Sequence, residues 1–194
     1  MDFSQLSNLG LLLAVLLVAL LESLAVIGLL VPGIAMLLAL TLVAVDAGVP
    51  AWGWFLAGSV GAFAGDGVSF WLGQKAGPGV RHWAYFRRHP RVLAEGETFF
   101  LRYGVWSIML GRFIGPLRPV VPLAAGALAM PASRFWLANA LSSPAWGGVY
   151  LLGMYWLGEE FSQYLQPGPA LMFLAGATLV AVAVSLVLRG RQSS

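Results

Sequence analysis

Repeated apolar runs, several of them about 20 residues long, constrain this sequence more than any other feature. A helix needs roughly 20 apolar residues to cross about 30 Å of hydrocarbon. Hydrophobic residues make up 59% of the chain and charged residues 10%, against about 25% charged in soluble domains. The sequence therefore predicts an all-α, polytopic membrane protein with one membrane domain over residues 1–194.

The rest of the composition narrows the class of function. The chain has no cysteine, which excludes disulfides, thiol catalysis and cysteine metal sites. The basic residues behind its net charge of +3 lie beside apolar runs. Anionic lipid headgroups or a positive-inside bias therefore explain this charge better than nucleic-acid binding does. We expect no nucleic-acid partner, no metal and no cofactor. The first ten residues hold no Lys or Arg, so we expect the first apolar run to remain in the mature chain.

Breaks and polar residues divide the chain into six segments. In chain order these are a broken apolar segment at 9–45, a span at 51–74, a polar loop at 77–104, a second broken apolar segment at 105–129, and spans at 134–157 and 169–188. The polar loop carries five arginines, and residues 92–103 within it are expected to form an amphipathic helix at the membrane interface.

The distribution of charge predicts the topology. The arginine-rich loop should be cytoplasmic. If 105–129 crossed the membrane completely, Arg134 would lie outside and Glu159 with Glu160 inside, against the usual bias. If 105–129 enters and leaves on the cytoplasmic side, these charges and the basic C-terminal tail all fall where expected. We therefore predict a re-entrant hairpin at 105–129 and a cytoplasmic C-terminus.

The same reasoning places a second hairpin in the N-terminal half. If 51–74 runs inward, Asp46 lies outside, and 9–45 enters from that face and turns at Pro32 and Gly33. Two opposed hairpins, each followed by a span, are typical of transporters built from inverted repeats. The alternative is that 9–31 crosses the membrane by itself, because that run is long enough.

Two arginines, Arg112 and Arg118, lie within the second broken segment. On an unbroken helix, residues six apart point about 240° away from each other. The run is predicted to be broken at Gly115, Pro116, Pro119 and Pro122, and the first three breaks let both side chains face one cavity. Two such charges at mid-bilayer would cost about 5–7 kcal/mol, so they need a partner. Arginine pairs favour phosphate or carboxylate ligands, and the alternative is an ordinary cytoplasmic loop.

Two carboxylates are candidates to accompany the arginines. Glu22 has about ten apolar residues on each side, so we expect it to be a counter-ion for the arginines or a proton-coupling group. The alternative is an interfacial position. Asp66 is either a proton-coupling group or the structural partner of an arginine.

The motifs of this chain resemble those of the DedA family, also called SNARE-associated or VTT-domain proteins. The resemblance covers about residues 15–158 and rests on Glu22 followed by "LLVPG", then "GDGVSFWLGQKAG", "RYG", "GRFIGPLRPVVPLAAGALAM", Phe135, Asn139 and Trp146. It implies a bacterial inner-membrane protein with two opposed re-entrant hairpins. It also implies lipid translocation, notably of undecaprenyl phosphate, with Glu22, Arg112 and Arg118 at positions that the family needs.

Two positions depart from the family pattern. Many members carry an acidic residue directly after the first Pro-Gly, where this chain has Ile34, and that puts proton-driven transport in question. The proline that usually follows the first arginine motif is displaced to Gly115-Pro116, which implies a differently shaped hairpin tip.

These observations favour a non-enzymatic flippase for a lipid phosphate, with an anionic membrane lipid as its partner and an oligomer as a possible assembly. The alternative is a proton- or cation-coupled exporter of a small solute that supports membrane homeostasis. An intramembrane lipid phosphatase lacks a credible nucleophile–base pair, and a scaffold leaves the buried charges unexplained.

Overall fold

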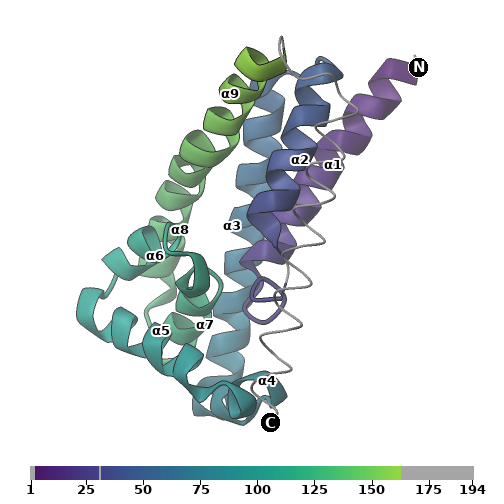
Figure 1. Ribbon diagram of the computed structural model, residues 1–194. Helices are drawn as coiled ribbons and strands as arrows, with labels where there is room; N and C mark the ends of the chain where they lie inside the picture. The colour runs from purple at the N-terminus through teal and green to yellow at the C-terminus, as the bar shows by residue number, and fades with distance from the viewer. Residues whose placement is uncertain (1–2, 31, 163–194) are drawn as a thin grey trace.

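The computed structural model describes residues 3–30 and 32–162, and every regular element in these ranges is helical (Figure 1). The predicted all-α class is confirmed. The predicted span at 169–188 lies outside the described residues.

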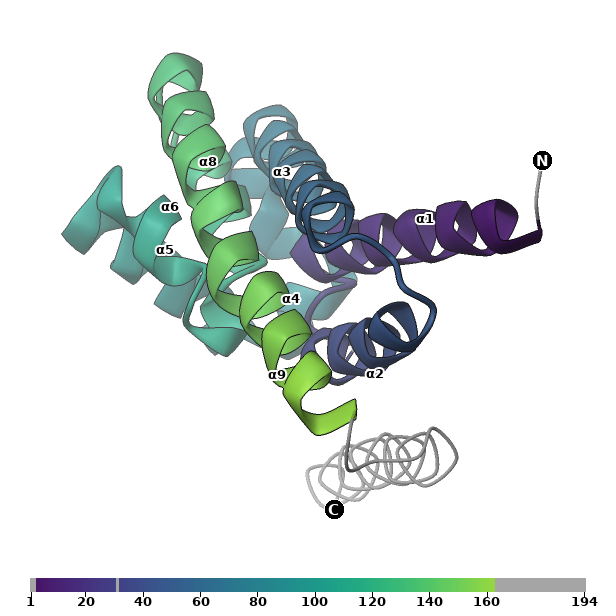
Figure 2. The same cartoon turned by 90° about the horizontal axis from the view of Figure 1, so that it is seen from above.

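Three helices form the N-terminal half: α1 (Phe3–Ser23), α2 (Gly33–Asp46) and α3 (Ala51–Ala76). Helix α3 packs against both α1 and α7, and α2 packs against α1 and α9 (Figures 1 and 2). Helix α3 approaches α1 so closely that a side chain at Gly65 would collide with the carbonyl of Leu20. Small residues at such crossings let helix backbones approach each other, as is usual in membrane bundles.

The first break lies earlier than the sequence predicts. The apolar run was expected to continue to Pro32 and Gly33, but α1 ends at Ser23 and residues 24–30 form turns. The cause is a contact from α3. The Ser69 hydroxyl donates to the carbonyl of Ser23 and accepts from the N–H of Ala25, both at 3.0 Å. This side chain satisfies backbone groups that would otherwise require a continued helix.

The polar loop is largely helical. It contains η1 (Gly77–His82), α4 (Ala84–Arg88) and α5 (Pro90–Tyr103), and α5 covers the predicted amphipathic helix. Exposed Arg81 forms an ion pair with Glu97 of α5 at 2.8 Å, and this carboxylate raises the pKa of the Arg81 guanidinium. The pair fastens α5 to the preceding segment.

The second broken segment consists of α6 (Trp106–Gly111), η2 (Gly115–Leu117) and α7 (Val120–Ala127). Pro119 lies directly before α7, whereas Pro122 lies within it, so the prediction that Pro122 breaks the backbone is wrong. Proline is tolerated in the first turn of a helix because the N–H groups there have no intrahelical partner.

A long, continuous helical segment closes the described part of the chain, made of α8 (Ala132–Trp146), the π-helical turn η3 (Gly147–Leu152) and α9 (Gly153–Ser162). It runs along one side of the bundle in Figure 1 and across the bundle in Figure 2. Pro144 lacks a backbone N–H, and the helix widens to the π form shortly after it.

The distribution of polarity is that of a protein in lipid. Leucines at four-residue spacing on α1 are exposed, as are Trp52 and Leu56 on α3, while four charged side chains are buried within residues 3–30 and 32–162. Among the described residues, one helical stretch, Ala51–Arg88, is long and apolar enough to cross a membrane. That the two broken segments are re-entrant, and related as inverted repeats, stays a prediction.

Candidate anion-binding site

Four ionisable side chains from distant parts of the sequence are buried together. Glu22 lies near the end of α1 and Asp66 in the middle of α3, while Arg112 and Arg118 flank the loop between α6 and α7. Each is at most 6% exposed. Two positive and two negative groups give the cluster a formal charge of zero, which is how buried charges are normally accommodated.

Arg118 pairs with Glu22. The distance from its Nη1 to the Glu22 Oε1 is 2.9 Å, and its Nη2 donates to the Ser23 hydroxyl at 3.3 Å. The guanidinium also lies over the ring of Trp146, 4.0 Å from the ring centroid. This cation–π contact positions the arginine without occupying its hydrogen-bond donors.

Arg112 pairs with Asp66 and is held more firmly. Its Nη2 donates to the Asp66 carboxylate and, at 2.6 Å, to the Asn139 Oδ1. Asn139 in turn donates to the carbonyl of Phe63 and accepts from the Ser143 hydroxyl, both at 3.0 Å. This network joins α3, α8 and the loop, so that Arg112 is connected to the scaffold from two sides.

Several buried polar atoms of the cluster have no hydrogen-bond partner among the described residues. They are the Nε and Nη1 of Arg112, the Nε of Arg118, the Oε2 of Glu22 and the Oδ1 of Asp66. Buried donors and acceptors are usually paired, because leaving one unpaired costs about 1–3 kcal/mol. Each arginine therefore keeps at least one buried guanidinium donor without a hydrogen-bond partner among the described residues.

A cavity of about 370 Å³ adjoins Glu22, the carboxylate of the Arg118–Glu22 pair. It lies between the first break and the second, and its described lining residues are Glu22, Gly28, Leu29, Pro32, Gly33, Ile34, Ala35 and Gly115. A side chain at Gly33 would collide with the Glu22 carboxylate, so the glycine allows that group to lie against the start of α2. Ile34 makes the adjacent wall apolar, which leaves Glu22 as the charged group among these lining residues.

The arrangement differs from the sequence-based expectation in one respect. Both arginines were expected to face a single cavity, but each pairs with its own carboxylate, and the described lining of the cavity includes Glu22 and neither arginine. Glu22 occupies the position of a counter-ion and Asp66 that of an arginine partner. The functional roles of all four residues stay predictions.

Sequence reasoning did not assign a role to Asn139 or to Trp146. A signal was present for Asn139, because it is a polar amide within an apolar segment, and such residues in membranes normally have a specific partner. Trp146 gave no such signal. No group of three or more His, Asp or Glu side chains lies close enough to hold a metal in the ranges 3–30 and 32–162.

The sequence of this chain is similar to those of known bacterial membrane proteins. The VTT domain family matches residues 31–156. The inner membrane protein YabI of Escherichia coli (strain K12) is 36% identical over 141 residues, which cover 73% of this chain and 56% of YabI. The membrane protein BU139 of Buchnera aphidicola is 32% identical over 142 residues, or 72% of this chain and 54% of BU139.

A mycobacterial membrane protein is similar as well. The membrane protein Rv2637 of Mycobacterium tuberculosis is 34% identical over 146 residues, which cover 69% of this chain and 63% of that protein. The chain thus spans a little over half the length of the curated relatives it matches. No solved structure matches.

Proposed function

The chain belongs to the VTT-domain (DedA) family of membrane proteins, and we propose that it is a transporter that flips a lipid phosphate, such as undecaprenyl phosphate, across the bacterial inner membrane. One observation carries the proposal. A buried arginine, Arg118, forms an ion pair whose carboxylate, Glu22, lines a cavity between the two broken segments. Such a pair can exchange its carboxylate for the phosphate of a ligand.

Charge balance gives the exchange a mechanism. The cluster is neutral with both ion pairs formed, and a buried net charge is costly. When a singly charged phosphate and one proton enter together, the proton neutralises Glu22 and the phosphate replaces it on Arg118. The net charge of the cluster is then unchanged. Glu22 can serve as the coupling group in this scheme even though position 34 carries no carboxylate.

The surroundings of the cavity favour a lipid over a free anion. Ile34 in its wall is 47% exposed, and Ile27 and Leu30, which adjoin the lining residues Gly28 and Leu29 in the sequence, are 41% and 49% exposed, so we take these side chains as an apolar border. A hydrocarbon chain can remain along this border while its phosphate enters the cavity. The size of the cavity, about 370 Å³, is at the lower end of the range of roughly 300–1,000 Å³ for small-molecule sites and suits a headgroup alone.

The proposal includes the predicted topology. We place the protein in the inner membrane as a multi-pass protein with its C-terminus in the cytoplasm. The two broken segments would enter from opposite faces, which would bring their tips together at the level of the cavity. Irregular backbone is tolerated at that depth where protein or a wet cavity covers it.

The experiment is a translocation assay in proteoliposomes, with fluorescent phosphatidic acid and undecaprenyl phosphate as separate probes. Arg118→Gln should reduce translocation of the accepted lipid to the rate of empty vesicles. Arg134→Gln, which removes an exposed arginine at the start of α8, should transport like wild type. Equal rates for the Arg118→Gln variant and wild type would refute the proposal.

The exposure of Glu22 to the cavity also supports the second candidate, a proton-coupled exporter of a small solute. The two functions differ in their dependence on lipid. Solute efflux that needs a proton gradient and is lost in Glu22→Gln, from vesicles that show no lipid translocation, would favour the exporter. Lipid translocation without any solute flux would exclude it.

A further inference from the structure

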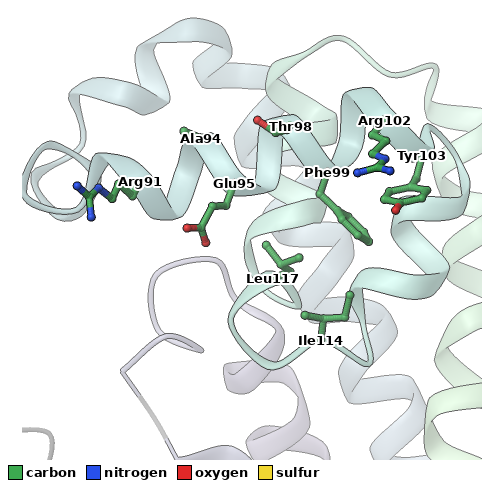
Figure 3. A pocket seen from close by; sticks show the side chains of 9 residues that line it. All are labelled: Arg91, Ala94, Glu95, Thr98, Phe99, Arg102, Tyr103, Ile114 and Leu117. Carbon is green, nitrogen blue, oxygen red and sulfur yellow. The ribbon is translucent and has the colours of Figure 1, made fainter.

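A second cavity, of about 550 Å³, lies outside the charge cluster, between α5 and the loop that joins α6 to α7 (Figure 3). Its volume is within the range of roughly 300–1,000 Å³ for small-molecule sites. One wall is the polar face of α5, where side chains recur at three- and four-residue spacing, as they do on one side of a helix. The lining residues of that helix are Arg91, Ala94, Glu95, Thr98, Phe99, Arg102 and Tyr103.

The opposite wall is apolar and is formed by the loop between α6 and α7, which contains Arg112 and Arg118. Ile114 and Leu117 face α5 from this loop, and Ile114 is 42% exposed (Figure 3). Arg112 precedes these two residues and Arg118 follows them, with both guanidinium groups buried on the inner side. The second cavity, called the groove below, and the charge cluster therefore share one loop.

The charges of the groove are unevenly distributed. Arg91 lies at one end of α5 and Arg102 with Tyr103 at the other, and Glu95 lies between them (Figure 3). Glu95 is one helical turn from Arg91 but about two turns, or roughly 10 Å, from Arg102. Arg102 thus offers a cation at a distance from the carboxylate, and Thr98, about one turn from both Glu95 and Arg102, offers a hydroxyl between them.

Exposed apolar and aromatic residues place this end of the groove near the membrane surface. Leu101 is 73% exposed, Trp106 is 65% exposed and Tyr103 is 39% exposed. Tryptophan and tyrosine concentrate at the level of lipid headgroups. An amphipathic helix with arginines on its polar face is also typical of interfacial helices that contact anionic lipids.

We propose that this groove is a docking site for an anionic lipid, in which Arg102 and Thr98 hold the phosphate and Phe99, Ile114 and Leu117 contact the first part of the hydrocarbon chain. The choice of a lipid phosphate as ligand rests on the proposed function. The groove holds the lipid beside the loop before it enters the inner cavity. It is a separate site from the Arg118–Glu22 pair.

The test is photo-crosslinking in nanodiscs with a diazirine-bearing phosphatidic acid, followed by mass spectrometry of the labelled peptides. Arg102→Gln should lower labelling of residues 94–103 by about tenfold, as expected for the loss of a charge-assisted hydrogen bond. Glu95→Gln should raise it by about twofold, because it removes a carboxylate roughly 10 Å from Arg102 that weakly repels the phosphate. The matched control is Arg87→Gln, the same exposed charge change on α4 outside the groove, and it should label like wild type.

The outcomes separate this site from the inner one. Arg118→Gln should leave labelling of residues 94–103 in place while translocation is lost. Equal labelling in Arg102→Gln and Arg87→Gln would refute the groove, even if translocation still required Arg118. Inorganic phosphate at the same concentration should not displace the probe, and full displacement would refute the choice of a lipid as occupant. Groove labelling without translocation by wild type would refute the proposed transport but not the groove.

Discussion

Two ion pairs of the same chemistry lie on one loop, but their surroundings differ. Arg112 and Asp66 are joined through Asn139 to the backbone of α3 and to Ser143 of α8. In the Arg118–Glu22 pair, Arg118 donates one longer hydrogen bond to the Ser23 hydroxyl and lies over the ring face of Trp146. The described lining of the inner cavity includes Glu22 but not Asp66, and it includes neither arginine, so only the Arg118–Glu22 pair reaches the cavity, through its carboxylate.

This difference suggests that the two ion pairs have different roles, one structural and one in binding. A pair whose members are hydrogen-bonded to the scaffold would lose those bonds on exchange, so the Arg112–Asp66 pair is suited to fix the loop. A pair held by a ring face and a cavity wall can separate with less disruption, so the Arg118–Glu22 pair is suited to bind. The predictions below test this assignment.

The largest effect is expected from Arg112→Ala. It leaves Asp66 buried without its partner, and breaking a buried pair costs about 3–5 kcal/mol. Thermal unfolding in detergent should show a large loss of stability. The double variant Arg112→Met with Asp66→Leu removes both charges and should recover most of that stability. A single variant as stable as wild type would show that this pair does not fix the loop.

Arg118→Gln should reduce transport far more than stability. Loss of the charged donor is expected to weaken binding of a lipid phosphate by about 10- to 100-fold. Glu22 remains beside the cavity, where a proton can neutralise it, so the protein should stay folded. Melting temperature and lipid binding, measured on the same preparation, check this. Loss of folding equal to that of Arg112→Ala would remove the distinction between the pairs.

Asn139→Ala should destabilise the protein by about 1–3 kcal/mol, because it leaves the Phe63 carbonyl and the Ser143 hydroxyl without their partner. Lipid affinity of the folded fraction should change little. Chemical unfolding and binding titrations measure the two quantities separately. A large loss of affinity with unchanged stability would show that Asn139, and Arg112 with it, belongs to the binding site.

The smallest effect is expected at Trp146. Its cation–π contact with Arg118 is worth about 0.5–2 kcal/mol, so Trp146→Leu should weaken lipid binding severalfold. Trp146→Phe keeps a ring face and should retain more of the affinity. If the leucine and phenylalanine variants bind equally, the ring face does not position Arg118.

Part of this architecture can be read from the sequence, since glycine and proline mark local breaks. The irregular loop around Gly115 and Pro119 and the extent of α3 both follow from local composition. The end of α1 at Ser23 does not, because no glycine or proline lies there and the cause is the Ser69 hydroxyl, 46 residues away. Local signals cannot report such a tertiary contact.

The candidate site shows the same limit. Buried charges in an apolar chain single out Glu22, Asp66, Arg112 and Arg118, since each is costly in lipid without a partner. The sequence cannot show which carboxylate meets which arginine, because Asp66 is 46 residues from Arg112 and Glu22 is 96 residues from Arg118. The packing of α1 and α3 against the loop decides the pairing.

The central claim is that Arg118 binds the lipid phosphate while Arg112 fixes the loop. Native mass spectrometry of protein released from nanodiscs containing phosphatidic acid tests it most directly, with wild type, Arg118→Gln and the Arg112→Met, Asp66→Leu double variant compared. The account predicts that wild type and the double variant retain the lipid in the inner cavity and that Arg118→Gln, still folded, loses it. Retention by Arg118→Gln, or loss by a folded double variant, would contradict the account.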